Sequence, residues 1–344
     1  MDGSATLGNS VLFQTGGRIG VGTTGPTVAL DVSGRINASK SYRMGGHDVI
    51  IMPGNPGTNN LGVGFGALQS TGITFGDTAV GDEALNENTL GHNNTAVGAF
   101  ALLANQGDGN TAVGNGALSQ NVAGTNNTAT GASAMFGNTG GSQNTAIGLG
   151  AMPTNSTGNS NIAIGYEAAM NVSGGNSNNI HIGSAGLSTD NATIRIGDLS
   201  IQTSFFVAGV SGVLTAVNDA VPVLIDSHGQ LGTISSSRRF KEDIQDMGDA
   251  SHGLMRLRPV TFRYQKAFAD GSKPIQYGLV AEEVAEVYPD LIAHSADGQV
   301  ETVKYQVLDS MLLNEVQRQQ KEIQSLQERL AKMEAVLAST ERTR

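Results

Sequence analysis

A short pattern of hydrophobic and polar residues repeats along much of the first half of the chain. The recurring unit reads Thr or Ile, then Ala, then Val or Ile, then Gly, and after two further residues it continues with Ala and Leu or Met. The eight intervals between the unit glycines measure 17, 17, 16, 17, 17, 17, 18 and 14 residues. These glycines are Gly64, Gly81, Gly98, Gly114, Gly131, Gly148, Gly165, Gly183 and Gly197. A short fixed period predicts a solenoid, in which each coil buries its apolar side chains against its neighbours.

Within each coil, the pattern predicts a short strand whose side chains alternate between two faces. We expect Val97, Ile147 and their equivalents to point inward, and the flanking polar residues to point outward. Runs of Asn, Gly, Ser and Thr between the units, such as 86–88 and 124–127, favour turns. A disordered low-complexity linker is the alternative for a segment so rich in Gly, Asn and Ser. The apolar residues stay in phase over eight intervals, and this regularity favours the solenoid.

The segments on either side of the repeats have weaker β patterns. Short β-type runs broken by Gly and Pro precede the repeats, at 17–26, 28–32 and 34–38. After the repeats, strands are expected at 205–210 and 221–226, with a turn at 227–230. The resulting division is an N-terminal β segment, the repeats, a β transition, a C-terminal domain and a terminal helix, at 1–59, 60–200, 201–235, 236–306 and 307–344.

From residue 236 onward, the pattern becomes that of an ordinary α+β domain. Residues 240–257 carry helix-forming and charged residues, and 259–264 alternate as a strand. Residues 277–284 start as a strand and turn into a short helix that ends before a proline. Residues 303–305 lead into a long helix.

The long helix carries a heptad pattern, in which seam positions are separated alternately by four and three residues. The seam consists of Leu312, Val316, Gln319, Ile323, Leu326, Leu330, Met333 and Leu337. It is compatible with a dimer or a trimer, and the polar Gln319 is of the kind that fixes register. A lone surface helix that packs on its own domain is the alternative. The strict alternation, with Gln, Glu, Lys and Arg between the seam positions, favours oligomerisation.

The charge distribution separates the chain into two physically different parts. The net charge of −10 divides into −8 before Ser236 and −2 from Ser236 onward, and no Lys or Arg lies between Arg43 and Arg195. An acidic surface without basic residues repels phosphate and anionic lipid, so we expect neither nucleic acid nor a membrane surface as a partner. No apolar run is long enough to cross a bilayer, so we expect no membrane insertion.

Several other classes of chemistry are disfavoured by the sequence. Residues 1–4 lack the basic and apolar regions of a secretory signal, so we expect export by another route, such as phage lysis, or a missing leader. The absence of cysteine excludes disulfides and cysteine nucleophiles. The six histidines do not fall at metal-ligand spacing and are interpreted as scattered surface residues, so we expect neither a metal nor a cofactor. The acidic pairs at 82–83 and 282–283 are interpreted as solvated surface rather than as a glycosidase pair.

Four ordered blocks in the last third of the chain resemble the endosialidase-type intramolecular chaperone domain of phage tail spikes and tail fibres. The resemblance covers 235–337, with blocks at 236–244, 257–262, 278–284 and 303–305. The repeats resemble the head repeats of trimeric autotransporter adhesins, and residues 1–50 resemble the N-terminal segments of tail-fibre-like proteins.

These resemblances imply a homotrimer with a mainly β solenoid or β-roll fibre, followed by an α+β chaperone domain that ends in a coiled coil. They imply a virion tail fibre or a bacterial cell-surface protein, with a cell-surface glycan or receptor as the candidate partner.

The chaperone resemblance also implies autoproteolysis by a serine–lysine dyad, which aligns with Ser236 and Lys241. The implied cut lies between Ser235 and Ser236, because the Ser236 hydroxyl would attack the Ser235 carbonyl while the lysine accepts the proton. A lysine acts as a base only when it is neutral, which burial or nearby positive charge favours, and the arginines at 238–239 supply such charge. This chain has Ser237 where the family commonly has Asp, a departure that bears on cleavage efficiency.

The expected function is therefore that of a trimeric fibre whose C-terminal domain gathers three chains, fixes the register of slow parallel β pairing, and then cuts itself off. One alternative is an adhesin or receptor-binding fibre that keeps its trimerisation domain. A second alternative is an enzyme spike that hydrolyses polysaccharide. The short, regular stalk leaves no room for a separate catalytic domain and disfavours this second alternative.

Overall fold

The chain divides into two compact units, Met1–Phe206 and Val207–Arg344. The computed structural model describes residues 12–33, 41–53, 58–70, 72–198 and 200–342. Among these residues, the first unit contains strands and turns but no helix, whereas the second contains helices and short strands. The strand predicted at 34–38 and the first four residues of the chain lie outside the described residues.

The first unit is built on two sheets. The smaller sheet joins β1 (Leu12–Thr15), β2 (Arg18–Val21) and β3 (Leu30–Val32). The larger sheet has eleven strands and follows the chain order from β4 (Ser41–Met44) and β5 (His47–Ile51) to β14.

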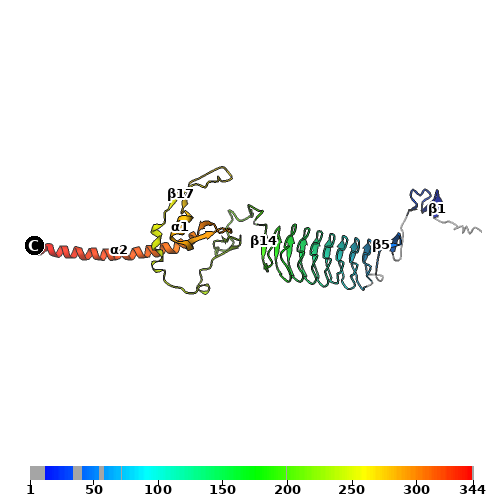
Figure 1. The fold of residues 1–344 in the computed structure, drawn as a ribbon, viewed down its shortest axis with the longest axis horizontal. Helices are drawn as coiled ribbons and strands as arrows, with labels where there is room; N and C mark the ends of the chain where they lie inside the picture. Colours follow the sequence, from blue (N-terminus) through cyan, green and yellow to red (C-terminus); the bar gives the residue numbers. More distant parts are fainter. Residues whose placement is uncertain (1–11, 34–40, 54–57, 71, 199, 343–344) are drawn as a thin grey trace, which may run out of the picture. The chain divides into compact units, whose positions relative to one another are not determined.

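The hairpin β4–β5 pairs antiparallel with β6, and every pair from β6 to β14 is parallel and consecutive. The parallel strands are β6 (Leu61–Val63), β7 (Thr78–Val80), β8 (Thr95–Val97), β9 (Thr111–Val113), β10 (Thr128–Thr130), β11 (Thr145–Ile147), β12 (Ile162–Ile164), β13 (Ile180–Ile182) and β14 (Ile194–Ile196). Figure 1 shows the coils that carry them stacked in sequence, so the predicted solenoid is confirmed.

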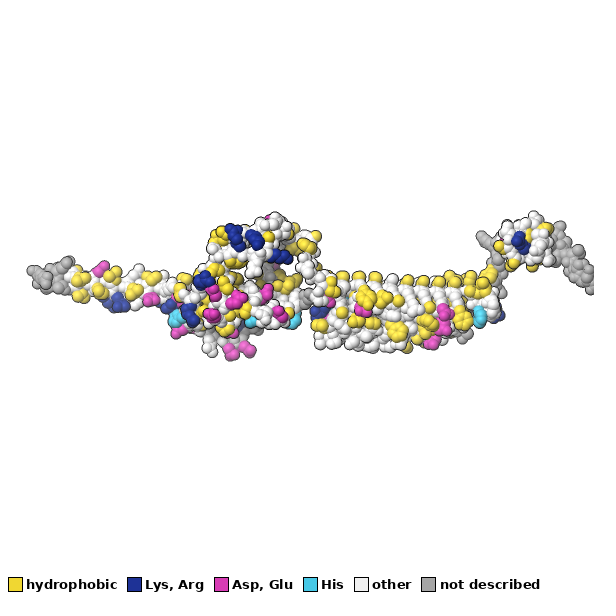
Figure 2. Space-filling view, turned by 45° about the horizontal axis from the view of Figure 1, so that its top comes forward, with side chains coloured by type: hydrophobic (Ala, Val, Ile, Leu, Met, Phe, Trp, Pro, Cys, Tyr) yellow, Lys and Arg dark blue, Asp and Glu magenta, His cyan; other side chains and the backbone are white. Residues whose placement is uncertain are grey.

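The direction in which the strand residues point differs from the prediction. Val97 is 38% exposed and Ile147 is 41% exposed, whereas the alanines that precede them, Ala96 and Ala146, are fully buried. Each of these strands is only three residues long, so the alternation of faces turns the central alanine inward and both neighbours outward. The β-branched residues therefore form a row on the outside of the sheet, and Figure 2 shows hydrophobic side chains spaced evenly along the repeat region.

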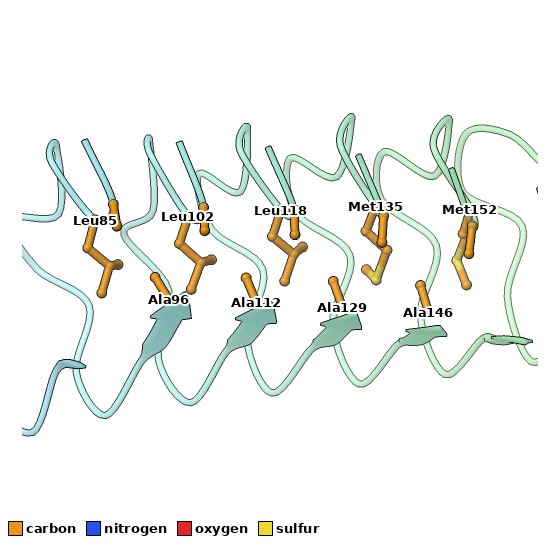
Figure 3. Packing of buried hydrophobic residues seen from close by; sticks show 14 of the residues in the cluster. Leu85, Ala96, Leu102, Ala112, Leu118, Ala129, Met135, Ala146 and Met152 are labelled. Carbon is orange, nitrogen blue, oxygen red and sulfur yellow. The ribbon is translucent and has the colours of Figure 1, made fainter. Parts of the chain in front are cut away.

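The interior of the solenoid consists of small and medium apolar side chains in columns. One column is the central strand alanine, and a second is the Ala-Leu or Ala-Met pair on the opposite wall (Figure 3). Figure 3 shows Leu102 and Leu118 extending toward Ala96 and Ala112, and Met135 extending toward Ala129. The small alanines leave room for the longer side chains opposite, which explains why the larger Val and Ile are found outside.

Buried asparagines add a polar ladder to this apolar interior. Asn127 donates from its backbone N to Asn110 Oδ1 at 3.0 Å and from Nδ2 to the Gly141 carbonyl at 2.8 Å, and Asn144 repeats the same contacts one coil later. Such bonds satisfy backbone groups that the turns leave unpaired inside the coil. The unit glycines complete the stack, because Gly131 has φ +131° and a Cβ there would lie 2.4 Å from the Gly148 carbonyl oxygen.

The second unit is a small α+β domain followed by a long helix. Its elements are β15 (Leu224–Ile225), β16 (Leu231–Gly232), the 3-10 helices η1 (Arg238–Phe240) and η2 (Gly248–Arg256), β17 (Val260–Phe262), β18 (Gln276–Gly278), α1 (Ala281–Val287), η3 (Pro289–Leu291), β19 (Ile292–His294), β20 (Val300–Val303) and α2 (Tyr305–Arg342). Three antiparallel hairpins pair β15 with β16, β17 with β18 and β19 with β20. The core consists of Leu254, Val284, Leu291, Ile292, Val303, Leu308 and Met311.

Several sequence predictions for this unit are confirmed. β17 lies within the predicted strand 259–264, and β18 leads to α1, which ends before Pro289 because proline cannot continue a helix. The long helix begins at Tyr305 and contains no Gly or Pro, in keeping with its length. A turn joins the two strands of the β15–β16 hairpin, as expected at 227–230.

Two predictions were wrong. Residues 205–210 do not form a strand, and the strand expected at 221–226 is limited to Leu224–Ile225. A strand requires a hydrogen-bonding partner, and the single chain offers none to 205–210. Within 240–257, where the sequence carries helix-forming residues, Gly248–Arg256 form the 3-10 helix η2. Gly248 takes a positive φ of +53° at the start of η2, and Gly253 weakens helical propensity further.

Candidate cleavage segment and assembly surfaces

The predicted cleavage residues lie on an exposed segment between the β15–β16 hairpin and η2. Ser235, Ser236 and Lys241 are all exposed, and the 3-10 turn η1 separates the serine from the lysine. The Phe240 amide donates to the Ser237 carbonyl at 3.0 Å, and the Lys241 amide donates to the Arg238 carbonyl at 3.1 Å.

The single chain does not assemble a working dyad from these residues. Among the described residues, no hydrogen bond joins the Ser236 hydroxyl to the Lys241 amine, and neither side chain is covered by another element. The Arg239 guanidinium lies over the Phe240 ring at 4.7 Å, within the same turn. A lysine needs burial or close positive charge to act as a base, and the Lys241 side chain is exposed in the single chain.

The helix α2 presents two different faces over its first turns. Leu308, Met311 and Glu315 are buried against the domain, whereas the predicted seam begins at Leu312, which is 50% exposed. Ile323 is 49% exposed. The other apolar seam positions that are exposed are Val316, Leu326, Leu330, Met333 and Leu337. The helix does not use its seam to pack on its own domain within the described residues.

A second exposed apolar surface runs along the outer face of the large sheet. It is formed by the last residue of successive strands and is called the outer row here. The outer row comprises Val80, Val97, Val113, Thr130, Ile147, Ile164, Ile182 and Ile196. Consecutive members lie in register on adjacent parallel strands, as in the pair Val97 and Val113. The row is apolar except at Thr130 and carries no charge, which is unusual for a surface that remains in water.

A third apolar surface follows the solenoid. Along 201–234 every residue except Leu224 is exposed, and the exposed fraction reaches 92% at Phe206 and 95% at Leu214. The only regular structure in this stretch among the described residues is the short β15–β16 hairpin. A soluble monomer does not usually leave so many Val, Ile, Leu and Phe side chains exposed along one stretch of chain.

Ionisable side chains replace neutral residues at two places in the solenoid interior. Asp77 lies where other coils have Asn and accepts from the Asn94 amide at 2.8 Å, and burial raises the pKa of Asp77 above its usual value. His181 lies in register with Ala163 and is 1% exposed, with Nε2 3.7 Å from Asp190 Oδ2. The interpretation of all six histidines as surface residues was therefore wrong for His181. The Arg195 guanidinium holds the pKa of Asp190 below its usual value.

A buried polar cluster joins η2 to α2. Glu315 is 1% exposed and lies 3.5 Å from the Ser251 hydroxyl, while Arg318 Nε donates to its carboxylate at 3.0 Å. Asn314 Nδ2 donates to Ser251 Oγ at 2.7 Å and to the Gly248 carbonyl at 2.8 Å. The heptad pattern does not reveal this cluster, because heptad positions alone do not show which face of a helix contacts its own domain.

No group of His, Cys, Asp and Glu in the described part of the chain is arranged to hold a metal ion. Within these described residues, no helix combines the length and the apolar content needed to cross a membrane.

Comparison with known families assigns part of the second unit. Residues 236–293 match the peptidase S74 family model, described as the chaperone of endosialidase. The matched segment includes Ser236, Lys241, η2, β17, β18 and α1. No curated protein and no solved structure was found to match the chain. An endosialidase-type chaperone domain near the C-terminus, preceded by a β-solenoid, is thus the organisation of this chain.

Proposed function

We propose, from the endosialidase-type chaperone domain at 236–293, that this chain is one subunit of a three-copy fibre of the phage tail-fibre type. In this proposal the C-terminal domain acts as an intramolecular chaperone that gathers three chains. It then releases itself by a cut between Ser235 and Ser236. The assembled fibre stands on a virion or a bacterial cell surface, where a glycan or receptor is its partner.

The outer row is the observation that carries the three-copy proposal. Its members repeat once per coil along parallel strands, so a surface that covers them must repeat with the same spacing and direction. Another copy of the same chain meets this condition by construction. The absence of charge along the row also permits close approach of identical, acidic chains, which would otherwise repel one another.

The exposed seam of α2 supports the same proposal from the other unit. Seam residues such as Leu326 and Leu330 gain burial only when another helix covers them. A coiled coil of three α2 helices holds three chain ends together and raises the local concentration of the solenoid segments. This matters because parallel, non-local β pairing is slow and exposes strand edges while it forms.

The proposed cleavage reaction uses only groups of the chain and one water molecule. Ser236 Oγ attacks the carbonyl carbon of Ser235, the bond from that carbon to Ser236 N breaks, and Lys241 transfers the hydroxyl proton to the departing amine. The ester that joins Ser235 to Ser236 Oγ is then hydrolysed by water, which leaves a carboxylate on Ser235 and restores the hydroxyl of Ser236. Exposure of both dyad residues in the single chain supports a reaction that waits for assembly.

The role of Ser236 and Lys241 in cleavage is tested by replacing each with alanine. Purified Ser236→Ala and Lys241→Ala chains are expected to remain full length, with cleavage slowed by about a thousandfold or more, because each change removes the nucleophile or its base. Wild-type protein is expected to give two fragments divided after Ser235, measured by intact mass and on a denaturing gel over time.

Exposed residues of the same unit provide matched controls for this test. Ser227→Ala and Lys266→Ala are expected to cleave as the wild type does. A Ser236→Ala chain that still divides after Ser235 would refute the assignment.

A fibre that keeps its chaperone domain is the second candidate. The observation that favours it is Ser237, which stands where the family commonly has Asp beside the nucleophile. A single full-length band from protein that is fully trimeric would support this adhesin-like or receptor-binding alternative.

A further inference from the structure

Glu315 is a buried carboxylate for which the fold of the single domain gives no simple reason. It lies on α2, at the point where the helix leaves the core formed around Leu308 and Met311. Its partners are Arg318 Nε, Gln319 Nε2 at 3.2 Å and the Ser251 hydroxyl at 3.5 Å. The Arg318 side chain is 42% exposed, so its ion pair with Glu315 is partly screened by water and adds little stability, which leaves a positioning role for the carboxylate.

One side of this cluster is connected to the predicted seam. Gln319 is a seam residue, and its side-chain amide donates to Glu315 Oε1. Assembly of three α2 helices brings the Gln319 side chains toward the axis of the coil. The Glu315 carboxylate therefore contacts a residue whose surroundings change on assembly.

The other side of the cluster is connected to the cleavage segment. Asn314 and Glu315 hold Ser251, and Asn314 also holds the Gly248 carbonyl at the first residue of η2. Gly248 follows Lys241 by only seven residues, through an exposed stretch. The direction in which the chain leaves η2 thus depends on contacts with α2.

We propose that Glu315 is a positioning residue that couples assembly of the α2 seam to placement of the segment bearing Ser236 and Lys241. This inference rests on the proposed function. In the single chain, the Glu315 contacts hold η2 while the dyad stays exposed. When the Gln319 side chain packs in the coil, Arg318 and Ser251 keep the Glu315 carboxylate in place. The position of η2 relative to the coil is then fixed, and the segment before η2 is oriented toward the neighbouring copies.

The test uses the full chain and separates assembly from cleavage. In Glu315→Gln, the carboxylate is replaced by an amide of the same size, and we expect a trimer by native mass with cleavage slowed by about tenfold. Ser251→Ala removes the hydroxyl on the η2 side without changing α2, and we expect a similar slowing. Because both changes break the contact between Glu315 and Ser251, the double variant should be slowed no further than about either single variant. Glu328→Gln, at an exposed position of the same helix, is the matched control and should cleave as the wild type does.

The outcomes distinguish this inference from the proposed function. Wild-type trimers that stay uncut would overturn the proposed self-cleavage itself. Cleaving wild-type protein together with a trimeric Glu315→Gln chain cut at the normal rate would overturn only the coupling. If Glu315→Gln fails to assemble, Ser251→Ala decides, and a trimeric Ser251→Ala chain with the normal rate also overturns it. Additive slowing in the double variant contradicts a shared contact and leaves general destabilisation as the explanation.

Discussion

At the scale of single residues, His181 shows how one substitution in a repeat creates a titratable site. It occupies a position that is alanine in the preceding coil, and both ring nitrogens are buried without hydrogen-bond partners. Burial lowers the pKa of His181 below 6.5, although Asp190 opposes this effect and Arg195 adds to it. Asp190 is held by two bonds from the Arg195 guanidinium, at 2.6 and 2.7 Å, and has a lowered pKa. Among the described residues, Asp190 and Arg195 are the charged groups that act on this histidine.

Acid is therefore expected to loosen the last coils of the solenoid. Below pH 6.5 the unfolded chain takes up a proton on this histidine before the folded chain does, so stability falls as the pH drops toward the lower folded pKa. Asp190 stays ionised in this range, because its pKa lies below that of an ordinary carboxyl. Hydrogen exchange over 172–197, corrected for intrinsic rates, should accelerate between pH 7.5 and pH 5.

The matched variants for this prediction are His181→Ala and His47→Ala. His181→Ala restores the residue of the preceding coil and should lose the acid response, whereas His47→Ala, at an exposed position of β5, should keep it. An unchanged acid response in His181→Ala would show that another group controls it.

At the scale of one element, the close approach of neighbouring coils limits which residues a coil can carry at the unit glycines. Gly131 has a positive φ and lies against the next coil, so Gly131→Ala introduces both backbone strain and an overlap with the Gly148 carbonyl. We expect a loss of about 1 to 3 kcal/mol in the free energy of unfolding, measured by thermal or denaturant melting.

Gly140→Ala is the control for the unit glycine. Its φ is not in the left-handed region, and its nearest neighbour for an added Cβ is Thr157 Cγ2 at 3.9 Å. The change should alter stability by no more than about 0.5 kcal/mol. Equal losses in the two variants would contradict the close-stacking explanation.

The same element shows what the sequence could and could not predict. The period and the glycines were sufficient to predict the solenoid, because each follows from the geometry of one coil. The orientation of Val97 and Ile147 was not predictable from hydrophobicity, since the narrow interior accepts Ala at the strand and Leu or Met opposite. The alanine in the middle of every strand from β7 to β12 was the available signal.

In the second unit, local pattern predicted β17, α1 and α2 but not the surroundings of Ser236 and Lys241. Under the proposed function, neighbouring copies complete those surroundings, so the pattern of one chain could not describe them. Glu315 was missed for a different reason. Its burial depends on the contact of α2 with η2, which lies 64 residues away in the chain at Ser251.

At the scale of the whole molecule, the outer row should determine whether three copies associate along the solenoid. Ile147→Asp places a carboxylate in the row, and burying it without a partner costs about 3 kcal/mol per chain. After cleavage, when α2 no longer holds the three chains together, we expect the solenoid fragment of the variant to keep its β-rich circular dichroism spectrum. We expect it to lose trimer at micromolar concentration, measured by analytical ultracentrifugation.

Leu149→Asp is the matched change outside the row, at an exposed leucine two residues further along the same coil. It should leave the trimer intact. Loss of trimer in both variants, or in neither, would contradict the proposed interface.

Because β6 to β14 pair consecutively and in parallel, the length of the solenoid is set by the number of its coils. Each coil contacts only the coil before and the coil after, so removal of one whole unit leaves every remaining neighbour with an equivalent partner. The length then changes by one strand spacing of about 4.8 Å, while both ends keep their structure. A fibre of this construction can be lengthened or shortened by duplication or deletion in steps of 17 residues, and its reach can change without redesign of the domain that assembles it.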